Sequence, residues 1–137
     1  MSLILDTTIL IDSERRNEGV EDIVRRARAV HGEGDIALSA VSAVELTHGI
    51  YRAKSDADRS RRQVFVEDVL NGLIVYPLTL EIAQLAGRIE GEEAAKGNTI
   101  AFEDLLIGAT ALNVGFSVAT RNVRHFQAIP GLNVVSL

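Results

Sequence analysis

The stretch Leu3-Ile4-Leu5-Asp6 opens the chain with three consecutive apolar residues followed by an acid. A short continuous apolar run is typical of a strand that is buried on both faces, as in a parallel sheet covered by helices. We therefore expect the first strand to stop at Asp6, which puts this carboxylate at the carboxyl end of the strand.

Similar apolar runs recur along the chain, separated by segments with helical periodicity. The runs cover residues 36–38, 73–76, 116–119 and 132–135, and the helical segments cover residues 20–30, 42–54, 57–70, 80–96 and 102–113. This alternation indicates βαβ units. The sequence predicts an α/β fold with a mainly parallel sheet of four to five strands, flanked by helices on both faces.

The composition favours one domain over residues 1–137, since 47% of the residues are hydrophobic and 24% are charged. The chain has no cysteine, which excludes disulfide scaffolds, thiolate nucleophiles and zinc–thiolate sites. No apolar run approaches the ~20 residues of a bilayer span. We expect a cytoplasmic protein without a membrane segment.

The formal net charge of −5 does not indicate a nucleic-acid binder with a uniformly basic surface. The most polar region is the basic stretch 52–62, which also contains Asp56 and Asp58. We interpret this stretch as the solvated face of a helix.

Three carboxylates are predicted to meet at one edge of the sheet. Asp6 ends the first strand, Glu45 follows the second strand, and Asp104 opens the helix before the fourth strand. Ligands of parallel sheets bind beyond the carboxyl ends of the strands. Three acids in one cleft repel each other, and a divalent ion with oxygen ligands, Mg²⁺ or Mn²⁺, would relieve that repulsion. Such a site can activate water against a phosphodiester.

Each of these acids also has a purely structural interpretation. Glu45 has the spacing of a capping box with Ser42, at the start of a helix. Asp104 would be favourable at any helix N-terminus, and Asp6 is an ordinary residue for a turn. The residues alone leave both interpretations open.

Several motifs together resemble the PIN-domain family, and within it the VapC-type toxins of bacterial toxin–antitoxin pairs. The motifs are Leu5-Asp6-Thr7-Thr8, Ser42-Ala43-Val44-Glu45-Leu46 with Gly49, the segment 103–111, the segment 119–126, and Ile129-Pro130-Gly131-Leu132. They occur in the family's order over essentially the whole chain.

The resemblance implies a Rossmann-like PIN fold and an endoribonuclease that depends on one or two Mg²⁺ or Mn²⁺ ions and inhibits translation. It implies that Asp6, Glu45 and Asp104 are metal ligands and carry catalysis. The family's fourth acidic position falls on Asn122, whose neutral amide would hold metal more weakly.

The resemblance also implies roles for residues beside these acids. Thr120 would orient water or phosphate, or simply end its strand, and Arg121 and Arg124 would contact the RNA backbone. Glu103 could restore the charge that is absent at Asn122. Because neighbouring helix positions point about 100° apart, we expect Glu103 to be peripheral if Asp104 faces the cleft.

The expected partners are a small VapB-type antitoxin, an RNA substrate that is a transfer or ribosomal RNA, and a second copy of the chain in a homodimer. No membrane partner is expected. All three partners are implied by the resemblance.

Two alternative functions remain. Because of Asn122, the protein could be a catalytically weak or inactive PIN-fold module that binds RNA or protein. Asp6 could also be the nucleophile of a haloacid-dehalogenase-type phosphatase, although Thr8 occupies the place of that family's second aspartate. His31, His48 and His125 are too scattered to indicate a zinc site or a catalytic triad.

Overall fold

Five parallel strands form one sheet in the computed structural model, which describes residues 1–137. The strands are β1 (Leu3–Leu5), β2 (Ile36–Ser39), β3 (Ile74–Tyr76), β4 (Ser117–Thr120) and β5 (Val134–Ser136). Their order across the sheet is β3-β2-β1-β4-β5, and every neighbouring pair is parallel. The predicted α/β class is confirmed, with β1 at the centre of the sheet.

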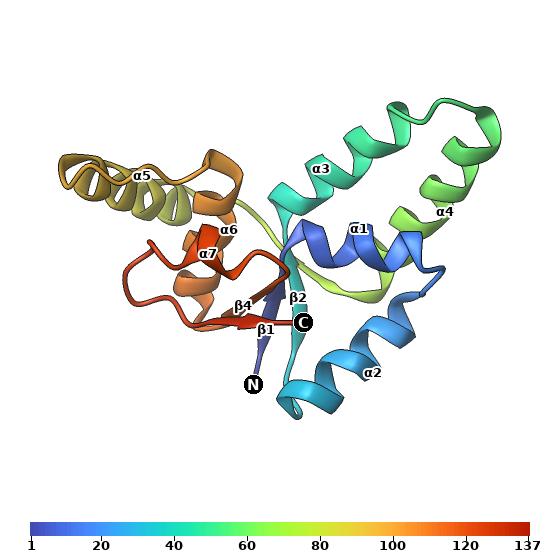
Figure 1. The fold of residues 1–137 in the computed structure, drawn as a ribbon, viewed down its shortest axis with the longest axis horizontal. Coiled ribbons are helices and arrows are strands. Elements are labelled where there is room, and N and C mark those ends of the chain that lie inside the picture. Colours follow the sequence, from blue (N-terminus) through green and yellow to red (C-terminus); the bar gives the residue numbers. More distant parts are fainter.

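Helices connect the strands and cover both faces of the sheet. They are α1 (Thr7–Arg15), α2 (Val20–His31), α3 (Ala40–Tyr51), α4 (Asp56–Gly72), α5 (Leu80–Ala95), α6 (Phe102–Val114) and α7 (Val123–Phe126). In Figure 1, α3 and α4 project together away from the sheet as an arm, while α5 and α6 lie on the other side. None of the helices combines the length and apolar character that a membrane span requires.

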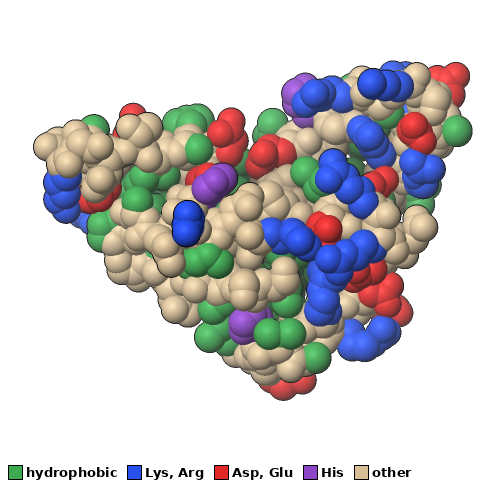
Figure 2. Space-filling view, in the orientation of Figure 1, with side chains coloured by type: hydrophobic (Ala, Val, Ile, Leu, Met, Phe, Trp, Pro, Cys, Tyr) green, Lys and Arg blue, Asp and Glu red, His purple; other side chains and the backbone are tan.

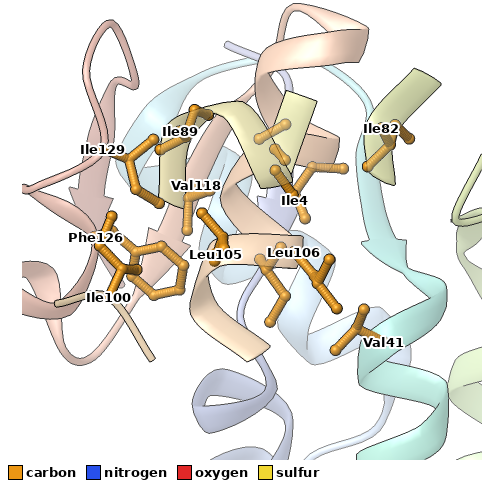
Figure 3. Close-up of a cluster of buried hydrophobic side chains, with 14 of the residues drawn as sticks. Ile4, Val41, Ile82, Ile89, Ile100, Leu105, Leu106, Val118, Phe126 and Ile129 are labelled. Carbon is orange, nitrogen blue, oxygen red and sulfur yellow. The ribbon is translucent and has the colours of Figure 1, made fainter. Parts of the chain in front are cut away.

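Two hydrophobic clusters hold the layers together, one on each face of the sheet. Leu3 and Leu5 of β1 belong to the cluster that includes residues of α1, α2, α3 and α4, whereas Ile4 belongs to the cluster with α5 and α6. This division follows from the alternation of side chains along a strand. Figure 3 shows Ile4 among Ile82, Leu105 and Leu106. Burial on both faces explains why β1 is a continuous apolar run.

Parallel register brings the carboxyl ends of the central strands to one edge of the sheet. Leu5 is paired with Ala119, and the backbone N–H of Asp6 donates to the carbonyl of Ala119 at 2.9 Å. The residues that follow β1, β2 and β4 therefore lie close together, although they are distant in sequence.

The helix expected over residues 42–54 is α3, which covers Ala40–Tyr51, so both of its boundaries differ from the prediction. The capping-box spacing of Ser42 and Glu45 predicted a helix that begins at Ser42, but α3 begins at Ala40. Ser39 caps the helix instead, because its Oγ accepts a hydrogen bond from the backbone N–H of Val41 at 3.1 Å. Glu45 therefore lies in the second turn of α3 and has no capping role. The other four predicted helices are present, with ends within two residues of those expected.

Candidate active site

Asp6 lies directly after the central strand, and its side chain is almost completely buried. Its Oδ2 accepts hydrogen bonds from Thr8 Oγ1 and Thr120 Oγ1, each at 2.7 Å. These two hydroxyls fix the orientation of the carboxylate. Oδ1 has no hydrogen-bond partner within the chain, so it is the oxygen of Asp6 that is free to bind an ion.

Glu45 is held by a pair of buried hydroxyls. Its Oε1 accepts a hydrogen bond from Thr7 Oγ1 at 2.7 Å, and Thr7 Oγ1 lies 2.9 Å from Ser42 Oγ. A hydroxyl has only one proton, and that of Thr7 is donated to Glu45. Ser42 is therefore the donor to Thr7, and the relay from Ser42 through Thr7 ends on the carboxylate.

Asp104 enters the same region from the first turn of α6 and is half-buried. His125 on α7 lies next to it, with 3.5 Å between His125 Nδ1 and Asp104 Oδ2. Asp104 lies 98 positions after Asp6 in the chain. The packing of α6 and α7 on the face of the sheet brings these residues to its carboxyl edge.

Burial and neighbouring negative charge raise the pKa of two of the three acids, Glu45 and Asp104. Burial, and after it the charges of Asp6, Glu45 and Glu103, together raise the pKa of Asp104 to about 6, while the charge of His125 opposes the rise. The pKa of Glu45 is also raised, first by burial and then by the charges of Asp6 and Glu103, against the lowering effect of the Thr7 hydrogen bond. The three acids singled out in the sequence thus share one electrostatic environment.

The chemistry of these donors fits a hard divalent cation. All are oxygens, they carry uncompensated negative charge in a partly desolvated site, and Oδ1 of Asp6 has no partner. Mg²⁺ and Mn²⁺ prefer such ligands, and the raised pKa values reflect burial first and repulsion between the acids second, both of which a bound ion would offset. No three acidic or histidine side chains are arranged around one point in the structure so that they already form a complete ligand set.

The residues predicted beside the acids differ in their burial. Thr120 is fully buried, donates its proton to Asp6 and accepts from the backbone N–H of Asn122 at 2.9 Å. Asn122 is exposed and immediately precedes α7. Glu103 is also exposed, as expected from its position beside Asp104, yet it is near enough to raise the pKa of both Glu45 and Asp104.

The two arginines differ in their surroundings. Arg121 forms an ion pair with Asp12, with 2.8 Å between Nη1 and Oδ2, and Asp12 is also paired with Arg16 at 2.9 Å. Arg124 is exposed and has no carboxylate within ion-pair distance. Arg124 is therefore the freer of the two cations beside the acids.

Four residues of the site were missed in the sequence: Thr7, Thr8, Ser42 and His125. Thr8 donates a hydrogen bond to Asp6 and belongs to the same motif. Thr7 and Ser42 hold Glu45, and the only signal for them was their place in the two motifs that also contain Asp6 and Glu45. His125 was set aside because it lies far from the other histidines, but its neighbour in space is Asp104. Spacing along the chain gives no indication of that contact.

A groove of about 920 Å³ runs from Glu45 along the inner side of the α3–α4 arm. It is lined by residues of α1, α3 and α4, by Leu78, and by the beginning of α6, and Glu45 and Glu103 mark its acidic end. Figure 2 shows acidic side chains in the notch between α6 and α3, and Lys and Arg side chains over the α3–α4 arm and α1. The candidate site therefore opens into a larger surface feature.

Comparison with known proteins identifies the family. The PIN domain family matches residues 3–132. Ribonuclease VapC1 of Rickettsia felis is 30% identical over 137 residues, which covers 100% of this chain and 97% of that protein. The tRNA(fMet)-specific endonuclease VapC of Salmonella typhimurium is 31% identical over 94 residues, which covers 69% of this chain and 71% of that protein.

A solved structure, that of DNA-bound VapBC from Salmonella typhimurium, agrees with this assignment. It superposes with a TM-score of 0.83 at 26% sequence identity, over 99% of this chain and 98% of that one. The order of the strands, the acids at the carboxyl edge of the sheet and the match over nearly the whole sequence lead to the same conclusion. The chain belongs to the PIN domain family, and its full-length relatives include VapC ribonucleases.

Proposed function

We propose that this protein is the toxin of a toxin–antitoxin pair, an endoribonuclease that uses Mg²⁺ or Mn²⁺ to hydrolyse RNA phosphodiester bonds and thereby inhibits translation. The proposal is supported by the likeness to VapC ribonucleases over the whole chain. The observation that carries it is the proximity of the three acids at one edge of the sheet, where the charge of Asp6 contributes to the raised pKa of both Glu45 and Asp104. We expect this activity in the cytoplasm, where its RNA substrates are found.

In this proposal, the residues of the site have different roles. Asp6, Glu45 and Asp104 provide the anionic oxygens, and Asn122 adds a neutral one. Thr8 and Thr120 orient Asp6, while Thr7 orients Glu45. Arg124, and Arg121 when it leaves Asp12, would contact the RNA backbone.

A bound Mg²⁺ or Mn²⁺ would neutralise these carboxylates, lower the pKa of water in the site and stabilise charge on the phosphate oxygens of the substrate. The half-buried position of Glu45 and Asp104 limits competing water, which strengthens each electrostatic contact there. No side chain of the site is needed as a covalent nucleophile.

We propose a VapB-type antitoxin as the protein partner. The support is the likeness to the toxin chain of a VapBC complex at 26% identity. A transfer or ribosomal RNA is the proposed substrate, and one relative is named as a tRNA(fMet)-specific endonuclease. The homodimer stays a prediction, which sedimentation velocity of the purified protein would test.

A catalytically inactive PIN module is the alternative function, and Asn122 is the observation that favours it. The phosphatase alternative receives no support, since Thr8 donates a hydrogen bond to Asp6 in the place where that enzyme class needs a second acid. An activity measurement separates the two remaining functions.

The test is a digest of total RNA by the purified protein with Mg²⁺, with Mn²⁺ and with EDTA, followed by mapping of the new RNA ends. We expect a small set of cut sites that require a divalent ion. Absence of cleavage with both ions would favour the inactive module, and an unchanged cut pattern in EDTA would contradict the metal dependence.

A further inference from the structure

The groove changes its chemical character with distance from the acids. Glu45, His48 and Arg52 all line it and recur at spacings of three and four residues, so they lie along one face of α3. The face is acidic near the sheet and basic near the end of the helix, about 10 Å further along the axis.

Positive charge in the outer groove is not neutralised by the protein. The lining acids Glu14 and Asp58 are both paired with Arg61, which does not line the groove. The lining cations Arg15, Arg52, Lys54 and Arg62 have no carboxylate within ion-pair distance. Arg62 is anchored by a hydrogen bond of 2.7 Å to the carbonyl of Gly49, so its charge is held beside α3.

An exposed aromatic ring lies at the acidic end of the groove. Phe102 is 62% exposed, lines the groove and directly precedes Glu103 and Asp104. It belongs to neither hydrophobic cluster, and the one aromatic pair of the protein is Tyr76 with Phe116. The ring therefore contributes little to the core and has a face free for contact with another molecule.

We propose that this groove binds single-stranded RNA beside the cleavage site, with an unpaired base stacked on Phe102 and phosphates on Arg52, Lys54 and Arg62. The inference rests on the proposed ribonuclease function and names the surface that would hold the substrate. Unpaired bases stack on aromatic side chains, and phosphates bind cations independently of sequence. An exposed ring at one end of the groove and uncompensated cations at the other match that chemistry, and the groove is continuous with Glu45 of the site.

The test measures binding of a fluorescein-labelled single-stranded RNA of mixed sequence by anisotropy, with every variant made in an Asp104→Asn background to suppress cleavage. We expect Phe102→Ala to weaken binding about tenfold and Phe102→Tyr to preserve it. The double variant Arg52→Ala, Lys54→Ala should also weaken binding and should reduce the slope of log affinity against log salt by about 1.4.

Matched controls lie outside the groove. Leu80 is 74% exposed, and the side chain of Arg88 is 68% exposed, so Leu80→Ala and Arg88→Ala remove an apolar surface residue and a cation elsewhere. Both should bind the labelled RNA as the background variant does. Thermal unfolding of each variant checks that the fold is retained.

Unchanged RNA affinity in the groove variants would overturn the inference. If these variants bound RNA normally but lost affinity for the purified antitoxin, the groove would be a protein-binding surface instead. A parent protein that cleaves RNA while its groove variants bind RNA normally would refute only this inference. A parent protein that neither binds nor cleaves RNA would refute the proposed function as well.

Discussion

Thr7 and Glu45 are joined by a hydrogen bond of 2.7 Å across 38 positions of sequence. The bond links α1 to α3, and Ser42 extends it by donating to Thr7. A carboxylate on a helix normally has several rotamers to choose from. This relay selects one of them for Glu45 and opposes the rise of its pKa that burial causes.

Thr7→Val, which replaces the hydroxyl with a methyl group, should impair metal binding and RNA cleavage together. Outer-shell partners of metal ligands typically contribute about 10- to 100-fold to metal affinity or activity. The loss of a buried hydroxyl partner should also lower the free energy of unfolding by about 1–3 kcal/mol. Isothermal titration with Mn²⁺ and chemical denaturation measure these two effects.

Thr7→Ser is the matched control for that variant, because it keeps the hydroxyl. We expect its Mn²⁺ affinity to stay near that of the parent protein. Equal Mn²⁺ affinities of Thr7→Val and the parent would mean that Thr7 does not position Glu45.

Asp104→Asn should stabilise the protein when divalent ions are absent. The pKa of Asp104 is about 6 in the folded protein, against ~3.9 in an unfolded chain. Between pH ~3.9 and about 6, the Asp104 carboxyl binds more protons in the folded state than in the unfolded state. The free energy of unfolding therefore falls as pH rises through this range, and the loss is complete above pH 6. Allowing for solvent screening, the penalty is about 1 kcal/mol, or about 3 °C in Tm.

Thermal unfolding in EDTA from pH 4 to pH 7.5 checks this expectation. The Tm advantage of Asp104→Asn should grow as pH rises and vanish near pH 4. With saturating Mg²⁺ the order should reverse, since only the parent gains the full stabilisation by a bound ion. Asp35→Asn, which changes an exposed acid before β2 at the opposite edge of the sheet, serves as the control. A parent protein with the higher Tm in EDTA at pH 7.5 would contradict the account of Asp104.

The sequence was sufficient to predict the sheet and the convergence of its acids, because both follow from local patterns. The apolar run before Asp6 identifies a buried strand, and parallel strands bring their carboxyl ends to one edge. The start of α3 was not predictable, since Ser39 and Ser42 are both plausible caps and only tertiary packing buries Ser42 against Thr7. The contact of His125 with Asp104 depends on the packing of α6 and α7, for which no short-range signal exists.

Asn122→Asp should tighten the binding of divalent ions. The added charge raises the attraction for a cation in a site that already carries three carboxylates, and we expect Mn²⁺ affinity to rise about three- to tenfold. Asn122→Ala should weaken it, because it removes the amide oxygen. Isothermal titration compares the three proteins, and equal affinities in all of them would show that position 122 does not face the ion.

The most direct measurement of the central claim is single-turnover RNA cleavage by Asp6→Asn, with antitoxin binding by the same preparation as the control for folding. Asp6 contributes its free Oδ1 to the proposed ion site, so we expect cleavage to fall at least about a hundredfold while the antitoxin still binds. Cleavage by Asp6→Asn at the rate of the parent protein would show that the acids at the carboxyl edge of the sheet do not carry the reaction.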